Sequence, residues 1–496
     1  MKKLITGALV TLMVLTGSMQ SLAAAGEFEN FEYVSDLKVL KDLLNENHGN
    51  LYEHISEKEL NEAFENAYNA VDEDMTYPEF YEELAKIVSK IKDGHTSLSA
   101  AEWFKSQVNE NGMYLPLTIK KIEGKYVSDF VYDAIPLGAE IVSINGDDIE
   151  DIVSRLKTST ANETDDDAGL SQHLVEFLFP QLYTIYYGEA EENTVVYNDL
   201  DGNEQSVVLT SEDASLNELV TYKYSNYMTG KYGTSMQSID AEFIEEKRVG
   251  ILRIYTFSPA DSEYFTSCVD HFFREMKTRG YENLIFDVRG NLGGDSEIMD
   301  HILSYVIDEP MKSVDRIELY KLPTLSGLNM VSSEQDYSYL TGMVESVMND
   351  ERPFDEQRAD GAYRKADGTF VFEEEPIEPA KQNSFSGKIF AIADGGSFSC
   401  GTIFPQMIKK LENGTLVGLT PGGNYYDTTA GIMLDWTLPN TKTSITIPLV
   451  QLITESEKIE GISENSGVEP DIKVEQTLED FLNKEDTQLN SILESL

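Results

Sequence analysis

Cysteine is almost absent from this sequence, which has only Cys268 and Cys400 among its 496 residues. At most one disulfide can form, so packing must provide most of the stability. Cys400 lies in a run of small residues that is typical of a tight turn, a poor place for a bridge. We therefore expect two buried free thiols.

Basic residues are also scarce: 38 Lys and Arg stand against 88 Asp and Glu, a formal charge of -50. Such a surface repels nucleic acid and anionic membranes and favours solubility. The charge therefore argues against a nucleic-acid-binding protein, but it indicates no particular chemistry.

Long apolar runs are missing as well, apart from one at the N-terminus. Residues 1–25 contain Lys2 and Lys3, an apolar core from Leu4 to about Leu15, and a small-residue end at 23–25. These are the three parts of a secretory leader, and the core is too short to span a bilayer. We expect cleavage near Ala25 and export as a soluble protein without a membrane span, either to a periplasm or to the cell exterior.

The length predicts two or three domains. Residues 26–105 are predicted to form a helical domain, because Ser56 to Glu59 and Thr76 to Glu79 have capping-box spacing. His95 follows on a connection just after a helix and is a candidate functional residue. His48 is a weaker candidate, since it lies where the first helix is expected to stop.

Residues 106–165 change to short strands, with an Asn145-Gly146 turn before a helical pattern at 149–156. This resembles the later half of a PDZ-like domain, a module that binds an extended peptide as an added strand. A generic β-hairpin and helix is the alternative. Residues 166–240 are assigned to a linking or covering region, with a possible hairpin around 199–204.

Residues 241–475 are predicted to form an α/β domain, because a strand at 249–255, a helix at 260–279 and a buried strand at 283–288 alternate. The second strand leads into Asp287-Val-Arg-Gly-Asn-Leu-Gly-Gly294, whose glycines suit a nest of N–H groups for an anion. This loop lacks the Lys-Ser/Thr of a phosphate-binding loop and the spacing of a dinucleotide fingerprint. An oxyanion hole is the interpretation that remains. The polar stretch 310–385 is predicted to be an insertion, and 476–496 a C-terminal helical tail.

Ser399 lies between an apolar strand at 389–393 and a helical pattern at 403–411. Small residues fill the joint, as expected where a chain turns sharply and presents one hydroxyl beside backbone N–H groups. A catalytic nucleophile is one interpretation. Helix capping by Ser397 and Ser399 is another, and a Cys400 nucleophile is a third.

Four separated segments, in order, resemble the family of S41 peptidases over about residues 30–475. They are Asp93-Gly-His-Thr96, Asp287-Val-Arg-Gly-Asn-Leu-Gly-Gly294, Ser397-Phe-Ser-Cys-Gly401 and Glu464-Asn-Ser-Gly-Val-Glu-Pro-Asp471. The resemblance implies a multidomain α+β protein whose catalytic core is an α/β domain of the ClpP/crotonase type. It also implies a serine-type peptidase that acts on extended polypeptides and needs no metal or other cofactor.

The resemblance further implies roles for particular residues. Ser399 would be the nucleophile, His95 the general base and Glu464 the group that orients the histidine. The oxyanion hole would be formed by the N–H of Cys400 and that of Gly293 or Gly294, and the motif does not decide between these two glycines.

One departure from the family's pattern concerns the base. Members with a Ser-Lys dyad carry a lysine in the glycine loop about 25 residues after the serine, where this chain has Asn424, and a neutral amide cannot act as a base. Lys409 and Lys410 follow Ser399 too closely to reach back. A Ser-Lys peptidase with an unrecognised lysine, and a non-catalytic ligand- or peptide-binding protein on the same fold, remain as alternatives.

Overall fold

The computed structural model describes residues 28–111, 113–130, 134–160, 162–164, 169–211, 219, 238–324, 328, 338 and 362–496. The predicted leader at 1–25 lies outside the described residues, as do large parts of 166–240 and 310–385. Within the described ranges, no helix combines the length and the hydropathy needed to cross a bilayer.

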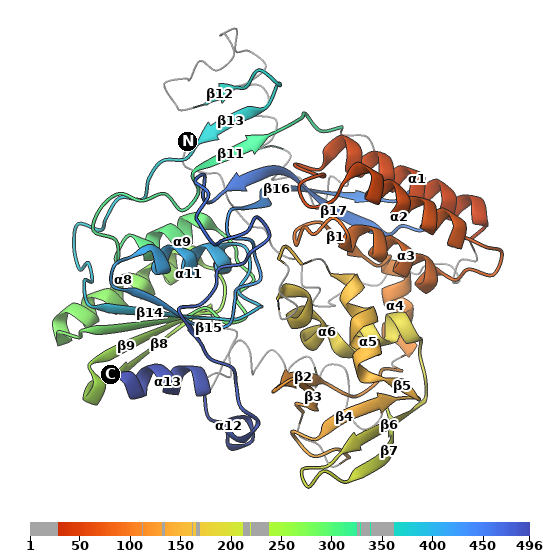
Figure 1. Cartoon of the computed structure of the whole chain (residues 1–496), viewed down its shortest axis with the longest axis horizontal. Coiled ribbons are helices and arrows are strands. Elements are labelled where there is room, and N and C mark those ends of the chain that lie inside the picture. Colours follow the sequence, from red (N-terminus) through yellow and green to blue (C-terminus); the bar gives the residue numbers. More distant parts are fainter. Residues whose placement is uncertain are drawn as a thin grey trace.

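The N-terminal part is helical, as predicted. Its elements are α1 (Asn30–Asn47), α2 (Glu57–Ala70), α3 (Tyr77–Ser89) and, after a short strand, α4 (Glu102–Asn111). Both predicted capping boxes form: the Glu59 and Glu79 side chains accept hydrogen bonds from the backbone N–H groups of Ser56 and Thr76 at 3.0 and 2.7 Å. The helices bury leucines and aromatic rings on one side and lie together at one end of the molecule (Figure 1).

A second layer is a sheet with the strand order β2-β3-β4-β6-β7, with β5 pairing to β4. Its strands are β2 (Ile119–Ile122), β3 (Lys125–Ser128), β4 (Glu140–Ile144), β5 (Asp147–Asp148), β6 (Glu192–Asn198) and β7 (Glu204–Thr210). Because β6 pairs with β4, residues 192–210 complete this sheet and do more than link or cover. The hairpin expected around 199–204 is confirmed by the β6–β7 pairing.

Helices α5 (Ile149–Leu156) and α6 (Leu170–Tyr187) pack beside this sheet, with the short 3-10 turn η1 (Lys157–Ser159) between them. α6 covers the edge strand β2: Glu176 Oε1 accepts a hydrogen bond from the Lys121 N–H at 2.9 Å. Peptide binding by strand addition needs a free strand edge. In this conformation the Lys121 N–H is occupied by the Glu176 side chain, which an added peptide strand would have to displace.

The third layer is the α/β core. Its sheet has the order β18-β15-β14-β10-β9-β8, and all neighbours are parallel except β8 with β9. The strands are β8 (Ile239–Ile244), β9 (Val249–Ile254), β10 (Asn283–Asp287), β14 (Lys388–Ala393), β15 (Gly414–Gly418) and β18 (Ile472–Lys473), with the turn η3 (Glu245–Lys247) joining β8 to β9. The predicted strand-helix-strand alternation at 249–288 is therefore confirmed.

Helices lie on both faces of this core sheet (Figure 1). α8 (Ser262–Arg279), α9 (Ser296–Leu303) and α11 (Cys400–Lys410) cover one face, and α13 (Thr487–Ser495) covers the other. Alternate strand residues serve the two sides: Leu284 and Phe286 belong to the large core, whereas Ile285 packs with Ile492 of α13. Because both faces of the sheet are buried, its strands are continuous apolar runs in the sequence.

A further sheet has the order β1-β17-β11-β13-β12, with β16 paired to β17. Its strands are β1 (Ser97–Ser99), β11 (Arg316–Leu319), β12 (Tyr363–Arg364), β13 (Phe370–Glu373), β16 (Asp427–Thr437) and β17 (Ser444–Ile453). β1 begins two residues after His95 and pairs with β17, with Ser97 opposite Thr446. The connection that carries His95 is thus anchored to this sheet.

The C-terminal tail is helical, as predicted, with α12 (Leu478–Asn483) followed by α13. Arg289 joins it to the glycine loop: its guanidinium donates to Asp486 Oδ2 at 2.7 Å and to Asp287 Oδ2 at 2.6 Å. Asp486 also caps α13 by accepting from the Leu489 N–H. Arg289, a residue of the glycine-loop motif, therefore ties this loop to the C-terminal tail.

The carboxyl group of Asp300 on α9 is expected to make the stability of the protein depend on pH. Burial, with the nearby charges of Asp295 and Glu297, raises the pKa of Asp300 to about 7, although the Ser313 hydroxyl opposes this shift. Because the folded-state pKa lies above the unfolded value of about 4, the stability from a neutral Asp300 is complete below pH 4 and is lost as the pH rises through 7. We expect Asp300→Asn, which stays neutral, to raise the free energy of unfolding at pH 8 but not at pH 4, as measured by urea unfolding.

Glu263→Gln, an exposed change on α8, is the control and should leave the pH dependence as in the wild type. A gain for Asp300→Asn of the same size at both pH values would contradict a titrating Asp300.

Candidate active site

Ser399 occupies a strained turn between β14 and α11. Its backbone has φ 56° and ψ -124°, in a region that residues other than glycine rarely adopt. Although Ser399 is at the N-cap position of α11, its side chain makes no capping hydrogen bond. The hydroxyl is therefore not used to cap the helix, which removes one alternative for Ser399.

Ser397 behaves differently from Ser399. Its hydroxyl donates to the Val288 carbonyl at 2.8 Å and accepts from the Asp394 N–H at 3.1 Å. These bonds tie the turn to the neighbouring strand β10 and its loop. Ser397 is thus a structural residue of the turn.

The glycine loop after β10 lies directly against this turn. A Cβ atom on Gly293, which has φ 103°, would stand 2.7 Å from Ser399 Cβ and 3.1 Å from Cys400 N. Asn291 holds the loop, since its carbonyl accepts from the Phe398 N–H and its side chain bonds Ile254, both at 2.9 Å. Only glycine fits so close to the serine, which brings together two motifs that are about 100 residues apart.

The same contacts distinguish the two candidate glycines. The Gly293 N–H already donates to Asn291 Oδ1 at 2.9 Å. Among the described residues, the N–H groups of Gly294 and Cys400 donate to no backbone carbonyl. Cys400 N and Gly294 N are therefore the pair of donors that no backbone or amide oxygen occupies.

The Cys400 side chain has a separate role. Its thiol donates to the Gly294 carbonyl at 3.2 Å, and burial, with the charges of Asp300 and Asp295, raises the pKa of Cys400 well above its ordinary value. A thiol that stays protonated is a poor nucleophile. Cys400 is buried and free as expected, whereas Cys268 is only half-buried.

His95 lies on the connection between α3 and β1 and is 4% exposed. Its ring packs against the Phe398 ring, with 4.6 Å between centroids, so it lies beside the residue that precedes Ser399. Its Nδ1 is 3.3 Å from Glu163 Oε1 and 3.3 Å from Thr428 Oγ1. Its Nε2 is buried and meets no hydrogen-bond partner among the described residues.

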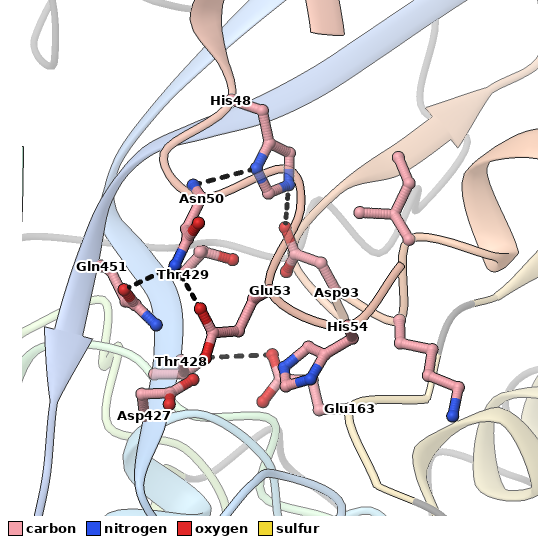
Figure 2. A pocket seen from close by; sticks show the side chains of 12 residues that line it. His48, Asn50, Glu53, His54, Asp93, Glu163, Asp427, Thr428, Thr429 and Gln451 are labelled. Carbon is pink, nitrogen blue, oxygen red and sulfur yellow. Dashed lines mark hydrogen bonds and ion pairs between the residues drawn. The ribbon is translucent and has the colours of Figure 1, made fainter. Parts of the chain in front are cut away.

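Glu163 is the carboxylate beside His95, and the sequence analysis missed it. Its side chain is 4% exposed, and it accepts from the Thr428 hydroxyl at 2.9 Å and from the Gly94 and Asn424 N–H groups at 3.3 Å. Figure 2 shows Glu163 bonded to Thr428 at the edge of a small pocket. In the sequence, Glu163 belongs to an acidic stretch without a motif, so no local signal marked it.

Glu464 does not occupy the position expected for it. Its side chain is 73% exposed and forms an ion pair with Lys458. Only its backbone takes part nearby, because the Glu464 carbonyl accepts from Asn424 Nδ2 at 2.7 Å. The motif at 464–471 thus closes the glycine loop through the main chain, and the orienting role of the Glu464 side chain stays a prediction.

The lysines considered as bases point elsewhere. Lys409 Nζ donates to the Glu469 carbonyl at 2.9 Å, and Lys410 pairs with Glu455 at 3.2 Å. Asn424 accepts from the Tyr426 N–H at 2.8 Å and so shapes the loop where a Ser-Lys peptidase would carry its lysine.

The pocket of Figure 2 is lined by Glu163 and Thr428, the two residues that His95 Nδ1 approaches. It is acidic, being lined by the carboxylates of Glu53, Asp93, Glu163 and Asp427. Burial, with the charge of Glu53, raises the pKa of Asp427 to about 6. Asp93, His95 and Glu163 each bring one possible metal-ligand atom within 4.8 Å of the others. Both carboxylates already accept hydrogen bonds from the protein: Asp93 from the His48 ring and the His95 N–H, and Glu163 from the Thr428 hydroxyl.

Comparisons with known proteins bear on the family and the fold. Residues 248–474 match the model of peptidase family S41, and residues 111–213 match the model of a PDZ domain. Residues 248–474 are thus a peptidase domain of family S41 and residues 111–213 a PDZ domain, and the chain is a serine-type peptidase.

Solved structures give the same fold. The chain resembles mature CPAF with a TM-score of 0.60 and 17% identity, covering 94% of this chain and 96% of the other. A structure of mature CPAF complexed with lactacystin matches with the same score and identity, covering 94% and 97%. No curated protein sequence matches the chain significantly.

The contact between Gly293 and Ser399 leads to a test. We expect Gly293→Ala to lower the rate at which a fluorophosphonate probe labels the protein by about a hundredfold, because the new methyl group would displace Ser399. The rate of labelling at fixed probe concentration is the measurement.

Gly124→Ala is the matched control: Gly124 also has a positive φ, 79°, but a Cβ there meets no atom within 4 Å. If the two substitutions slowed labelling equally, backbone strain alone would explain the loss, and the close contact with Ser399 would not matter.

Proposed function

We propose that this chain is an exported serine endopeptidase that hydrolyses extended polypeptides through an acyl-enzyme. Ser399 is the nucleophile, His95 the general base and Glu163 the group that orients His95. The observation that carries the proposal is the state of His95: Nδ1 lies against a buried carboxylate, while Nε2 is buried without a partner among the described residues.

The reaction begins with Ser399. A serine hydroxyl is a poor nucleophile near neutral pH, so His95 Nε2 accepts its proton as the oxygen attacks the scissile carbonyl. Glu163 keeps the other ring proton on Nδ1, which leaves the lone pair of Nε2 available. The imidazolium then gives its proton to the leaving amine, and water releases the acyl group by the same route.

The negative oxygen of the tetrahedral intermediate needs donors that are already in place. The N–H groups of Cys400 and Gly294 meet this need, whereas that of Gly293 is used by Asn291. Cys400 is also the first residue of α11, so the positive end of the helix supports the same charge. Losing one such donor typically costs about 3 kcal/mol, or about a hundredfold in rate.

A lysine base is the less favoured alternative, since Asn424 occupies the loop position and Lys409 and Lys410 are engaged elsewhere. A purely ligand-binding protein is also less favoured. Such a protein would have no need for a strained serine next to free N–H donors and a buried histidine.

Covalent labelling by a fluorophosphonate probe tests the nucleophile and the base. We expect Ser399→Ala to abolish labelling and His95→Ala to reduce it below detection, because the hydroxyl would lose its base. Ser397→Ala, which removes a hydroxyl two residues away, should keep labelling if the protein folds. Labelling that survives in Ser399→Ala would refute Ser399 as the nucleophile.

The choice between the two glutamates has its own test. Glu163→Gln should slow labelling by about a hundredfold or more, because the amide would favour the wrong tautomer of His95. Glu464→Gln should stay close to the wild type, since the Glu464 side chain is exposed. The reverse order of effects would restore Glu464 as the orienting group.

The pH dependence distinguishes histidine from lysine. With His95 as the base, the labelling rate should level off below about pH 8, because an imidazole loses its proton well before a lysine does. A rate that keeps rising well above about pH 8 would indicate a lysine.

A further inference from the structure

Asp93 is a buried carboxylate that the proposed reaction does not use. Its side chain is 5% exposed, yet three donors converge on it. Oδ1 accepts from the His95 N–H at 2.9 Å, and Oδ2 accepts from the Thr96 hydroxyl at 2.6 Å and from His48 Nε2 at 2.8 Å. Asp93 thus holds the backbone of His95 on one side and the ring of His48 on the other.

His48 comes from the turn that ends α1, 45 residues earlier in the chain, and its side chain is 1% exposed. Its Nδ1 accepts from the Asn50 N–H at 3.2 Å, so the ring proton is on Nε2 and is donated to Asp93. Figure 2 shows His48 between Asn50 and Asp93, with a dashed line to each. A neutral His48 leaves the negative charge of Asp93 uncancelled.

The position of His48 is fixed from outside the loop. The Gly49 N–H donates to the Pro448 carbonyl at 2.8 Å, and a Cβ on Gly49 would lie 2.9 Å from the Leu449 carbonyl carbon. The turn therefore sits directly on β17, the strand that also pairs with β1 just after His95. His48 is held by the same sheet as the loop whose carboxylate it contacts.

Asp93 stays ionised although it is buried. Burial alone would raise the pKa of Asp93, but the hydrogen bond from His48, the charge of His95 and the Thr96 hydroxyl together lower it below its ordinary value. His95 therefore lies near two carboxylates, Glu163 in contact and Asp93 with an oxygen within 4.8 Å of a ring nitrogen.

We propose that His48 and Asp93 form a positioning pair for His95, in which His48 fixes Asp93, and Asp93 both holds the His95 backbone and supplies a second negative charge that stabilises the imidazolium. This inference rests on the proposed function. Neither residue touches the substrate or the reacting atoms. They act only on the position and the basicity of His95.

Other charged groups surround the pair and remain unchanged in the test. From the packed elements, the titratable side chains that face this region are those of Glu53, His54, Lys92, Glu163 and Asp427. Because a negative charge near a histidine raises its pKa, removing the Asp93 charge should lower the apparent pKa of the labelling reaction.

The experiment measures fluorophosphonate labelling rates from pH 5 to 9 for wild type and three variants. Asp93→Asn keeps the shape of the side chain and should lower the apparent pKa by about half a unit or more, with at least a tenfold lower rate on the plateau. His48→Leu removes the donor to Asp93 and should also lower the plateau about tenfold, whereas His48→Gln, which can still donate, should recover to within about threefold of wild type.

His301→Leu is the matched control. His301 pairs with Asp270 at 2.8 Å, in a partly exposed histidine-aspartate pair on α8 and α9, so its loss should leave both the rate and the pKa unchanged. Thermal unfolding of each variant reports whether it is folded.

The outcomes distinguish a failure of the positioning pair from a failure of the proposed function. Labelling of the wild type with an unshifted pKa in Asp93→Asn, or no recovery in His48→Gln, would overturn the positioning pair and leave the proposed function intact. A folded wild type that is not labelled at any pH would overturn the proposed function and the inference with it.

Discussion

The contact between the His95 imidazole and the buried Glu163 carboxylate is the interaction on which the site depends. It joins three distant parts of the chain, since Thr428 of β16 bonds the same carboxylate and the N–H groups of Gly94 and Asn424 point at it. Burying an unpaired carboxylate is costly, so these donors are what allow Glu163 to lie there. The helical part, the core and the long β16–β17 hairpin therefore meet around one charge.

Glu163 itself lies within residues 111–213, the part of the chain that matches the PDZ model. The N-terminal end of α6 is capped by Asn162, whose side chain accepts from the Ser171 N–H at 2.8 Å, and the His173 ring packs directly on Gly396 of the serine turn. Less than one turn after His173, the Glu176 side chain bonds the edge strand β2. The edge of the PDZ sheet and the Glu163 carboxylate are thus linked through one short stretch of chain.

Much of this arrangement could be predicted from the sequence where the signal is local. Residues adjacent in the chain encode the turn at Ser399, the glycine loop at Gly293 and the helix ends. Their motifs can therefore be recognised in the sequence. Glu163 could not be predicted, because its role comes from tertiary contacts with Gly94, Asn424 and Thr428 and from no pattern around it. The motif containing Glu464 marked a real feature, the main-chain closure through Asn424, but not the side chain that meets His95.

The most direct test of the central claim is a crystal structure of the protein after reaction with a fluorophosphonate. We predict a phosphorus bonded to Ser399 Oγ, with one phosphoryl oxygen within hydrogen-bond distance of Cys400 N and Gly294 N, and His95 Nδ1 still against Glu163. An adduct on another residue, or His95 paired with Glu464 in place of Glu163, would contradict it.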